Sequence, residues 1–170
     1  MSYGIMPYMV NLQNVESCFA VEDEKKKSEL MQGAKEFIDD MMMQFGVPVD
    51  GIVQAFLDGS IINKSSPFIH WYFIESLIQK YGNMLENEYW YPANIDILYQ
   101  FKSLKLYDIN IEGLEAADDL PTVFVCRNKD LGALLSDTLY YFVDKEMKGE
   151  FIFWILLCNK YDKDLVLYYY

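Results

Sequence analysis

Hydrophobic positions predict four helices in the first half of the chain. Apolar residues recur there every three or four positions, the spacing that places them on one face of a helix. The stretches cover residues 12–19, 30–45, 50–57 and 67–81. Gly46 and Pro48 end the second stretch. Asp50 is placed to cap the third, the turn Asp58-Gly59 ends it, and Pro67 opens the fourth, which is apolar around most of its circumference.

The second half predicts two more helices and two strands. Asn128 is a good N-cap for a helix over 128–142, and residues 146–159 form a further helix. The apolar run inside 146–159 also suits a buried strand, but its length and period favour the helix. Residues 122–126 predict a strand. Residues 165–170 are apolar on both faces, which predicts a strand inside a sheet.

The opening of the chain predicts a strand at a sheet edge. Tyr3 to Val10 are apolar or aromatic apart from Gly4. Pro7 lies in their middle, and proline has no N–H to donate to a ladder. We therefore expect an edge strand or a bulge.

Periodicity weakens between residues 83 and 120. A helix near 94–102 and an extended piece near 107–111 are the expected elements. The segment between Leu106 and Cys126 contains acidic residues and no basic ones, which predicts a loop with helical turns. Its acidic residues are Asp108, Glu112, Glu115, Asp118 and Asp119.

Together these elements predict an α+β fold, in which a small mixed β-sheet packs against several helices and the C-terminal strand lies inside the sheet. The chain has 170 residues, 52% of them hydrophobic. That length suits one hydrophobic core. We expect a single domain over residues 1–170.

Charge argues against nucleic acid as a partner. The chain has 14 basic and 26 acidic residues, a net charge of -12, and Arg127 is its one arginine. Nucleic-acid binding needs clustered lysine and arginine to displace counterions. The run Lys25-Lys26-Lys27 is flanked by acidic residues and is typical of the solvated start of a helix.

Cysteine usage and the absence of a leader pattern indicate a cytoplasmic protein. Cys18, Cys126 and Cys158 are far apart in sequence and form no CxxC pair, which favours reduced thiols. The opening residues lack a basic region followed by an apolar run. The longest purely apolar run, Phe151 to Cys158, is much shorter than the ~20 residues that cross a bilayer. We expect no membrane contact.

No familiar catalytic or cofactor motif appears. The one histidine, His70, lies on a helix expected to be mostly buried, where a hydrogen-bonded packing role is favoured over a pocket role. The pairs Asp39-Asp40 and Asp118-Asp119 read as helix surface and turn residues. Glycines form no phosphate loop, and His, Cys and carboxylates form no metal pattern. We expect no metal and no cofactor, and the catalytic residues of any enzyme are unknown.

The unusual feature of the composition is its high content of aromatic residues, and Tyr89, Trp90 and Tyr91 form a dense aromatic run. Tyrosine and tryptophan are favoured at binding surfaces, since they bring large contact area with a polar tip. Core packing uses them equally well, so both interpretations stay open.

Three segments resemble an uncharacterised bacterial family of small acidic cytosolic proteins, a domain of unknown function. They are the opening SYGIMPYMVNL at residues 2–12, Leu120-Pro121-Thr122 before a strand and helix, and the end, where Phe151 and Trp154 precede Asp164-Leu165-Val166. More distantly, a helix followed by a final apolar strand is similar to YfbM-like proteins. The resemblance implies a fold class and a bacterial cytosolic setting, and no activity.

Two hypotheses for function remain. The first is a protein-interaction module, a class that includes immunity and antitoxin proteins, that recognises another protein of basic character through the acidic segment and the Tyr89–Tyr91 cluster. The second is an enzyme or small-ligand binder with a tyrosine-lined pocket that includes His70. Missing catalytic signatures favour the first.

Overall fold

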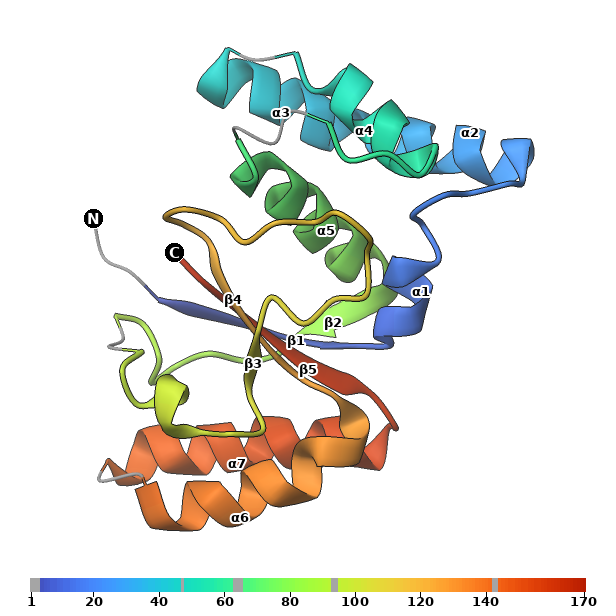
Figure 1. The fold of residues 1–170 in the computed structure, drawn as a ribbon. Helices are drawn as coiled ribbons and strands as arrows, with labels where there is room; N and C mark the ends of the chain where they lie inside the picture. The colour runs from blue at the N-terminus through green and yellow to red at the C-terminus, as the bar shows by residue number, and fades with distance from the viewer. Residues whose placement is uncertain (1–3, 47, 63–65, 93–94, 142–143) are drawn as a thin grey trace. The chain divides into compact units, whose positions relative to one another are not determined.

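The computed structural model describes residues 4–46, 48–62, 66–92, 95–141 and 144–170 (Figure 1). Its helices are α1 Leu12–Glu16, α2 Glu24–Gly33, α3 Lys35–Phe45, α4 Asp50–Leu57, α5 Phe68–Tyr81, α6 Leu131–Tyr141 and α7 Lys145–Lys160. Its strands are β1 Ile5–Val10, β2 Gly82–Met84, β3 Lys105–Leu106, β4 Thr122–Cys126 and β5 Asp164–Tyr169. Two 3₁₀ turns are η1 Leu98–Gln100 and η2 Asn128–Asp130.

The chain divides into two compact units. The first unit comprises Met1–Leu12, Ile78–Ile109 and Leu120–Tyr170, and it contains the sheet. The second comprises Gln13–Leu77 and Asn110–Asp119, and it is helical apart from its loops. The expectation of a single domain stays a prediction.

The sheet of the first unit has the strand order β2-β1-β5-β4-β3. The α+β fold and the internal position of the C-terminal strand β5 are therefore confirmed (Figure 1). All described pairs are antiparallel, rather than the mixture of directions that the sequence predicts.

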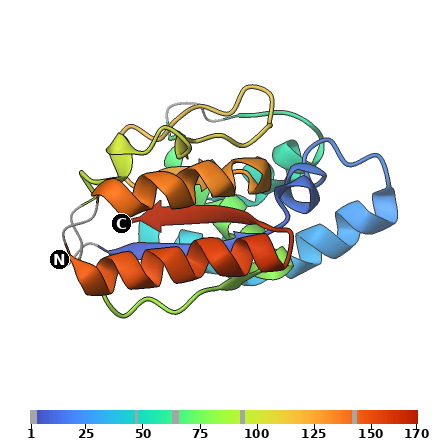
Figure 2. The same cartoon turned by 90° about the horizontal axis from the view of Figure 1, so that it is seen from below.

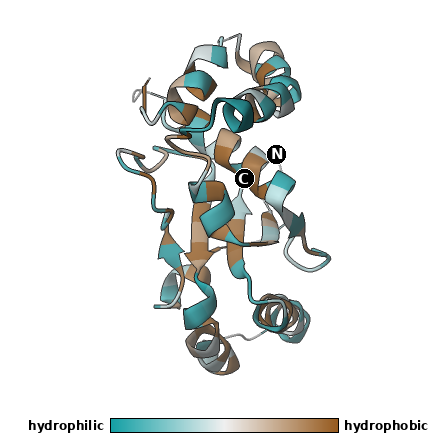
Figure 3. Ribbon diagram, turned by 90° about the vertical axis from the view of Figure 1, so that its right-hand side faces the viewer, coloured by the Kyte–Doolittle hydropathy of each residue, from teal (hydrophilic) through white to brown (hydrophobic). Residues whose placement is uncertain are grey.

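The core of this unit lies between the sheet and the pair of helices α6 and α7. Leu165 and Leu167 of β5 pack there with Phe151 and Trp154 of α7. The strands in the middle of the sheet are coloured mainly as hydrophobic in Figure 3. The alternate residues Val166 and Tyr168 are also fully buried, as a strand with two apolar faces requires.

The prediction of an edge or bulged strand at the N-terminus is wrong. β1 pairs with β5 without a break from Ile5 to Val10, and with β2 on its other side. Pro7 is tolerated because its nitrogen faces the β2 side of β1. The pairing of β1 with β2 begins only at Tyr8, so no strand residue there needs an N–H from Pro7. The carbonyl of Pro7 still accepts from Leu85 N at 2.8 Å. The sheet therefore lacks one N–H donor on the β2 side of Pro7, and the ladder to β5 is intact.

The helices of the second unit enclose a smaller cluster of Met41, Val49, Ile52 and Ile69. The stretch over 30–45 forms two helices, because α2 ends at Gly33 and α3 begins at Lys35. Glycine is a weak helix former, which places the break there. Asp50 is the first residue of α4, while Val49 holds the cap position without a side-chain bond.

Three local predictions in the first unit also need correction. Residues 95–102 contain only the 3₁₀ turn η1, and Asn94 lies outside the described residues. The extended piece ends at Leu106, because Tyr107 has a φ of 54° and turns the chain. Asn128 does not cap α6: it begins η2, and its side chain donates to the carbonyl of Lys163 at 3.1 Å.

Other elements are confirmed. β4 spans Thr122–Cys126 as predicted. The run over 146–159 is the helix α7, whose N-cap Asp144 accepts from the backbone N–H groups of Glu146 and Met147.

Candidate functional site

Residues 110–119, four of which are acidic, form a loop whose backbone is anchored within the second unit. Trp71 Nε1 of α5 donates to the carbonyl of Glu115 at 2.8 Å. The amide of Asn110 donates to Glu16 Oε1 of α1 at 2.9 Å. The side chain of Ile111 is buried with 6% exposure. Two backbone hydrogen bonds and one buried side chain therefore hold the path of this loop.

Four carboxyl groups of this loop face solvent: Glu112, Glu115, Asp118 and Asp119 are all exposed. We call these four residues the acidic loop. No basic residue interrupts residues 110–119. A fixed backbone with several exposed carboxylates creates a local negative potential that attracts cationic groups.

Asp108, the fifth predicted acidic residue, lies in the first unit and interacts with Arg127. The guanidinium donates from Nη2 to the carbonyl of Asp108 at 2.9 Å, and Nε lies 3.8 Å from Asp108 Oδ2. Both groups are partly exposed, so this ion pair is weak. Asp108 therefore has a cation beside it.

The aromatic cluster divides between core and surface. Trp90 is fully buried, its Nε1 donates to the carbonyl of Met147 at 3.1 Å, and its ring centroid lies 5.4 Å from that of Phe151. Tyr89 and Tyr91 are 40% and 53% exposed. The carboxylates of Glu88, Glu146 and Glu150 raise the pKa of Tyr89. Only the two tyrosines present side chains to solvent.

His70 is buried, as expected. Its side chain is 1% exposed, and Nε2 has no hydrogen-bond partner among the described residues. Burial lowers the pKa of the imidazole below its usual 6.5, because the charged form loses hydration. The predicted hydrogen bond is therefore absent at Nε2 within the described part of the chain.

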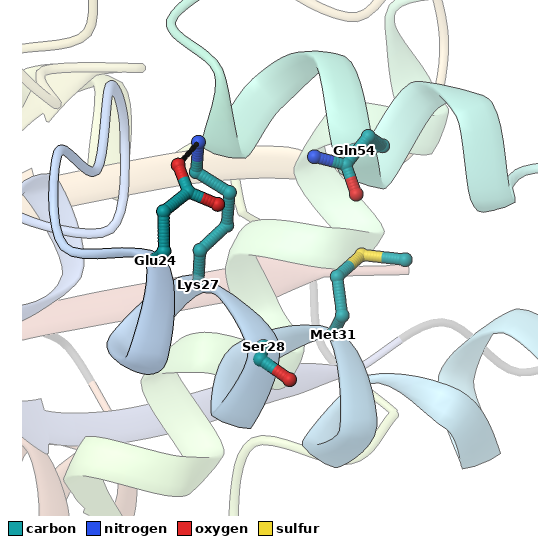
Figure 4. Close-up of a pocket in the computed structure, with 5 residues that line it drawn as sticks. All are labelled: Glu24, Lys27, Ser28, Met31 and Gln54. Atoms are coloured by element: carbon teal, nitrogen blue, oxygen red, sulfur yellow. Dashed lines mark hydrogen bonds and ion pairs between the residues drawn. The ribbon is translucent and has the colours of Figure 1, made fainter.

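A shallow pocket of about 320 Å³ lies between α2 and α4, lined by Glu24, Lys27, Ser28, Met31 and Gln54 (Figure 4). Lys27 Nζ lies 2.9 Å from Glu24 Oε1 and 2.8 Å from Asp58 Oδ1. The hydrogen bonds that Lys27 donates to Asp58 and Glu24 raise the pKa of Lys27. Neither tyrosine nor His70 lines this pocket.

Sequence reasoning missed this pocket, since it interprets residues 25–27 as one solvated basic run. The available signal was the i, i+3 spacing of Glu24 and Lys27, which places them on one side of a helix. The side chain of Lys27 is only 15% exposed and stands apart from the rest of the run.

The three cysteines are buried. Burial raises the pKa of Cys126 and Cys158 to about 12, so both stay as thiols near neutral pH. Within the described ranges, no three His, Cys, Asp or Glu side chains are grouped so as to hold a metal ion. The helices that the structure describes include none that is long and apolar enough to cross a membrane.

A protein-family model matches the chain over its whole length. The model of a family described as a domain of unknown function, DUF7691, matches residues 1–170. No curated protein and no solved structure matches the chain.

Proposed function

The chain belongs to DUF7691, a domain of unknown function, and we propose that it is a protein-interaction module that binds a basic protein through the acidic loop. The observation that carries this proposal is the combination of an anchored backbone with four exposed carboxyl groups. An anchored loop loses little conformational entropy when a partner binds.

The charge of the whole chain supports the same partner class. A net charge of -12 attracts a cationic protein at long range and raises the rate of association. The acidic loop then supplies local acceptors for lysine and arginine. We propose that the partner is basic for both reasons.

An immunity or antitoxin role in the bacterial cytoplasm is the specific form of this proposal. Small acidic proteins can neutralise basic toxins, and fast electrostatic association suits that task. The resemblance of residues 2–12 and the two later segments to an uncharacterised bacterial family supports this setting; a distant relation to YfbM-like proteins belongs to the same proposal.

The observations favour this proposal over an enzyme or ligand binder with a tyrosine-lined pocket. His70 is enclosed, with 1% exposure. The pocket between α2 and α4 draws its lining from Glu24, Lys27, Ser28, Met31 and Gln54.

The test compares two variants with equal charge. The loop variant carries Glu112→Gln, Glu115→Gln, Asp118→Asn and Asp119→Asn. The control variant carries changes at four exposed helix acids of the same unit: Glu29→Gln, Glu36→Gln, Asp39→Asn and Asp40→Asn. Tagged full-length chains are expressed in the organism that encodes them, and proteins that co-purify are quantified.

We expect at least one basic protein whose recovery falls about tenfold or more with the loop variant and is kept by the control. The purified pair should also associate more slowly as salt rises, because salt screens the attraction. Equal recovery with both variants would contradict a role for the acidic loop. Equal loss with both would mean that net charge alone, and no particular site, holds the partner.

A further inference from the structure

We propose that two copies of this chain associate through the outer face of α7, with the two helices packed antiparallel. The surface lies in the first unit and does not depend on the acidic loop of the second. The occupant is a second copy of the chain.

The outer face of α7 carries exposed apolar side chains. Its inner face buries Phe151, Trp154, Ile155 and Cys158 against the sheet. On the outer face, Phe153 is 48% and Leu156 50% exposed. Figure 2 looks onto α6 and α7, which lie side by side in front of β5. Neighbouring large apolar groups on the solvent side of a helix form the kind of patch that is typical of a contact with another molecule.

The end of α6 extends this apolar surface. Lys148 Nζ of α7 donates to the carbonyl of Leu139 at 2.8 Å, which places the last turn of α6 beside the first turns of α7. Leu139 is 57% and Tyr140 85% exposed. Exposed apolar side chains therefore occur on neighbouring parts of both helices.

Gly149 lies on the same outer face, one turn before Phe153. Glycine weakens a helix interior relative to alanine. A Cβ atom at Gly149 would meet no other atom within 4 Å, so packing inside the chain does not require glycine there. Close approach of a second helix is a physical reason for a glycine at this point.

Charge selects a second copy as the occupant. Two chains of net charge -12 repel each other, unless the contact is made where charge is balanced. α7 is such a place, because its charged residues are three lysines and two glutamates: Lys145, Lys148, Lys160, Glu146 and Glu150.

The order of these charges suits an antiparallel pair. Glu146 lies about two helical turns before Phe153, and Lys160 lies about two turns after it. A two-fold axis at Phe153 therefore brings Glu146 of each copy to the level of Lys160 in the other. Each ion pair forms twice, as an isologous contact requires. Gly149 then lies level with the turn that carries Leu156.

A contact between one helical face of each copy is small by the standard of obligate dimers, so we expect a reversible dimer with a dissociation constant on the order of micromolar. Sedimentation velocity of the full chain over a wide concentration range measures it. Glu146→Lys and Lys160→Glu, made singly, should each weaken the dimer about tenfold or more. The double variant should recover to within about threefold of the original chain, because its paired charges are exchanged.

This design separates a specific contact from bulk charge. Glu146→Lys makes the chain less negative and would strengthen non-specific association, whereas the contact predicts weakening. The double variant has the net charge of the original chain. A further pair, Leu156→Glu and the control Met84→Glu at another exposed apolar position of the same unit, should weaken the dimer only at Leu156.

A chain that stays monomeric at all concentrations overturns the proposal. A dimer that ignores these substitutions, or a double variant no better than the singles, also overturns it. Circular dichroism of each variant confirms that the fold is kept.

Discussion

Pro7 lies opposite Leu167 in an unbroken antiparallel ladder between β1 and β5. A proline is therefore placed inside a sheet, next to its central strand. The arrangement works because the nitrogen of Pro7 points to the side where the three-residue strand β2 has ended. The C-terminal strand β5 consequently has neighbours on both sides along its length.

This position predicts that β5 is essential for folding. Deleting residues 165–170 removes the strand between β1 and β4, so the truncated chain should aggregate or lose its cooperative thermal transition. The milder change Leu167→Ala should cost about 2 to 5 kcal/mol of unfolding free energy in urea titration. Tyr161→Ala is the control, since Tyr161 is 52% exposed and should change stability by about 0.5 kcal/mol or less. A soluble truncated chain with a nearly unchanged melting temperature would show that β5 is peripheral.

Asp164 joins three parts of the first unit through two backbone amides. Its Oδ2 accepts from Leu12 N and its Oδ1 from Asn128 N, both at 2.9 Å. Asp164→Asn exchanges one acceptor oxygen for a donor, so one amide loses its partner. We expect a loss of about 2 kcal/mol in chemical unfolding. Asp162→Asn makes the same charge change at an exposed neighbour and should have little effect; equal losses would contradict this role.

His70 should make stability fall as the solution becomes acidic. Burial lowers the pKa of His70 in the folded state below 6.5, so the unfolded chain binds more protons near that pH. The contribution of neutral His70 is fully present above the unfolded pKa and is lost as pH falls through it. Urea unfolding between about pH 7.5 and pH 5 should show that His70→Leu has a weaker dependence on pH than the original chain. Parallel pH profiles would show that His70 does not titrate on unfolding.

Gly82 and Gly132 should respond oppositely to alanine. A Cβ atom at Gly82 would lie 2.6 Å from the carbonyl oxygen of Met9 and 3.0 Å from that of Ile78, so backbone must move. We expect Gly82→Ala to cost about 2 to 4 kcal/mol in thermal or urea unfolding. Gly132 in α6 has open space, and Gly132→Ala should be neutral or stabilise by up to about 1 kcal/mol. A neutral Gly82→Ala would contradict the close approach.

Periodicity predicted the elements that bury a regular set of side chains. α7 and β5 follow from such patterns, because one face or both faces of each are apolar. The position of β1 did not follow, since the rule for proline depends on which neighbour its nitrogen faces, and that is a property of the assembled sheet. The break at Ala34 follows Gly33, a weak helix former that the apolar period over residues 30–45 does not take into account.

The candidate sites were predicted only in part. The acidic loop is visible as a run of like charges, but its anchor from Trp71 to Glu115 joins residues far apart in sequence. Tryptophan is common at binding surfaces, so its residue type alone does not place Trp90 in the core. The packing of Phe151 and Trp154 around its ring shows that it belongs there. The pocket beside Lys27 needs α2 and α4 to be brought together.

The buried thiols give each unit its own reporter of opening. Cys18 lies in the second unit, and Cys126 and Cys158 lie in the first, all three with 0% exposure. An alkylating reagent reaches a thiol only after its surroundings open, so the labelling rate at each cysteine measures how often that unit opens. If the chain is one cooperative domain, all three cysteines react together under mild denaturant; if Cys18 reacts at its own rate, the two units open independently.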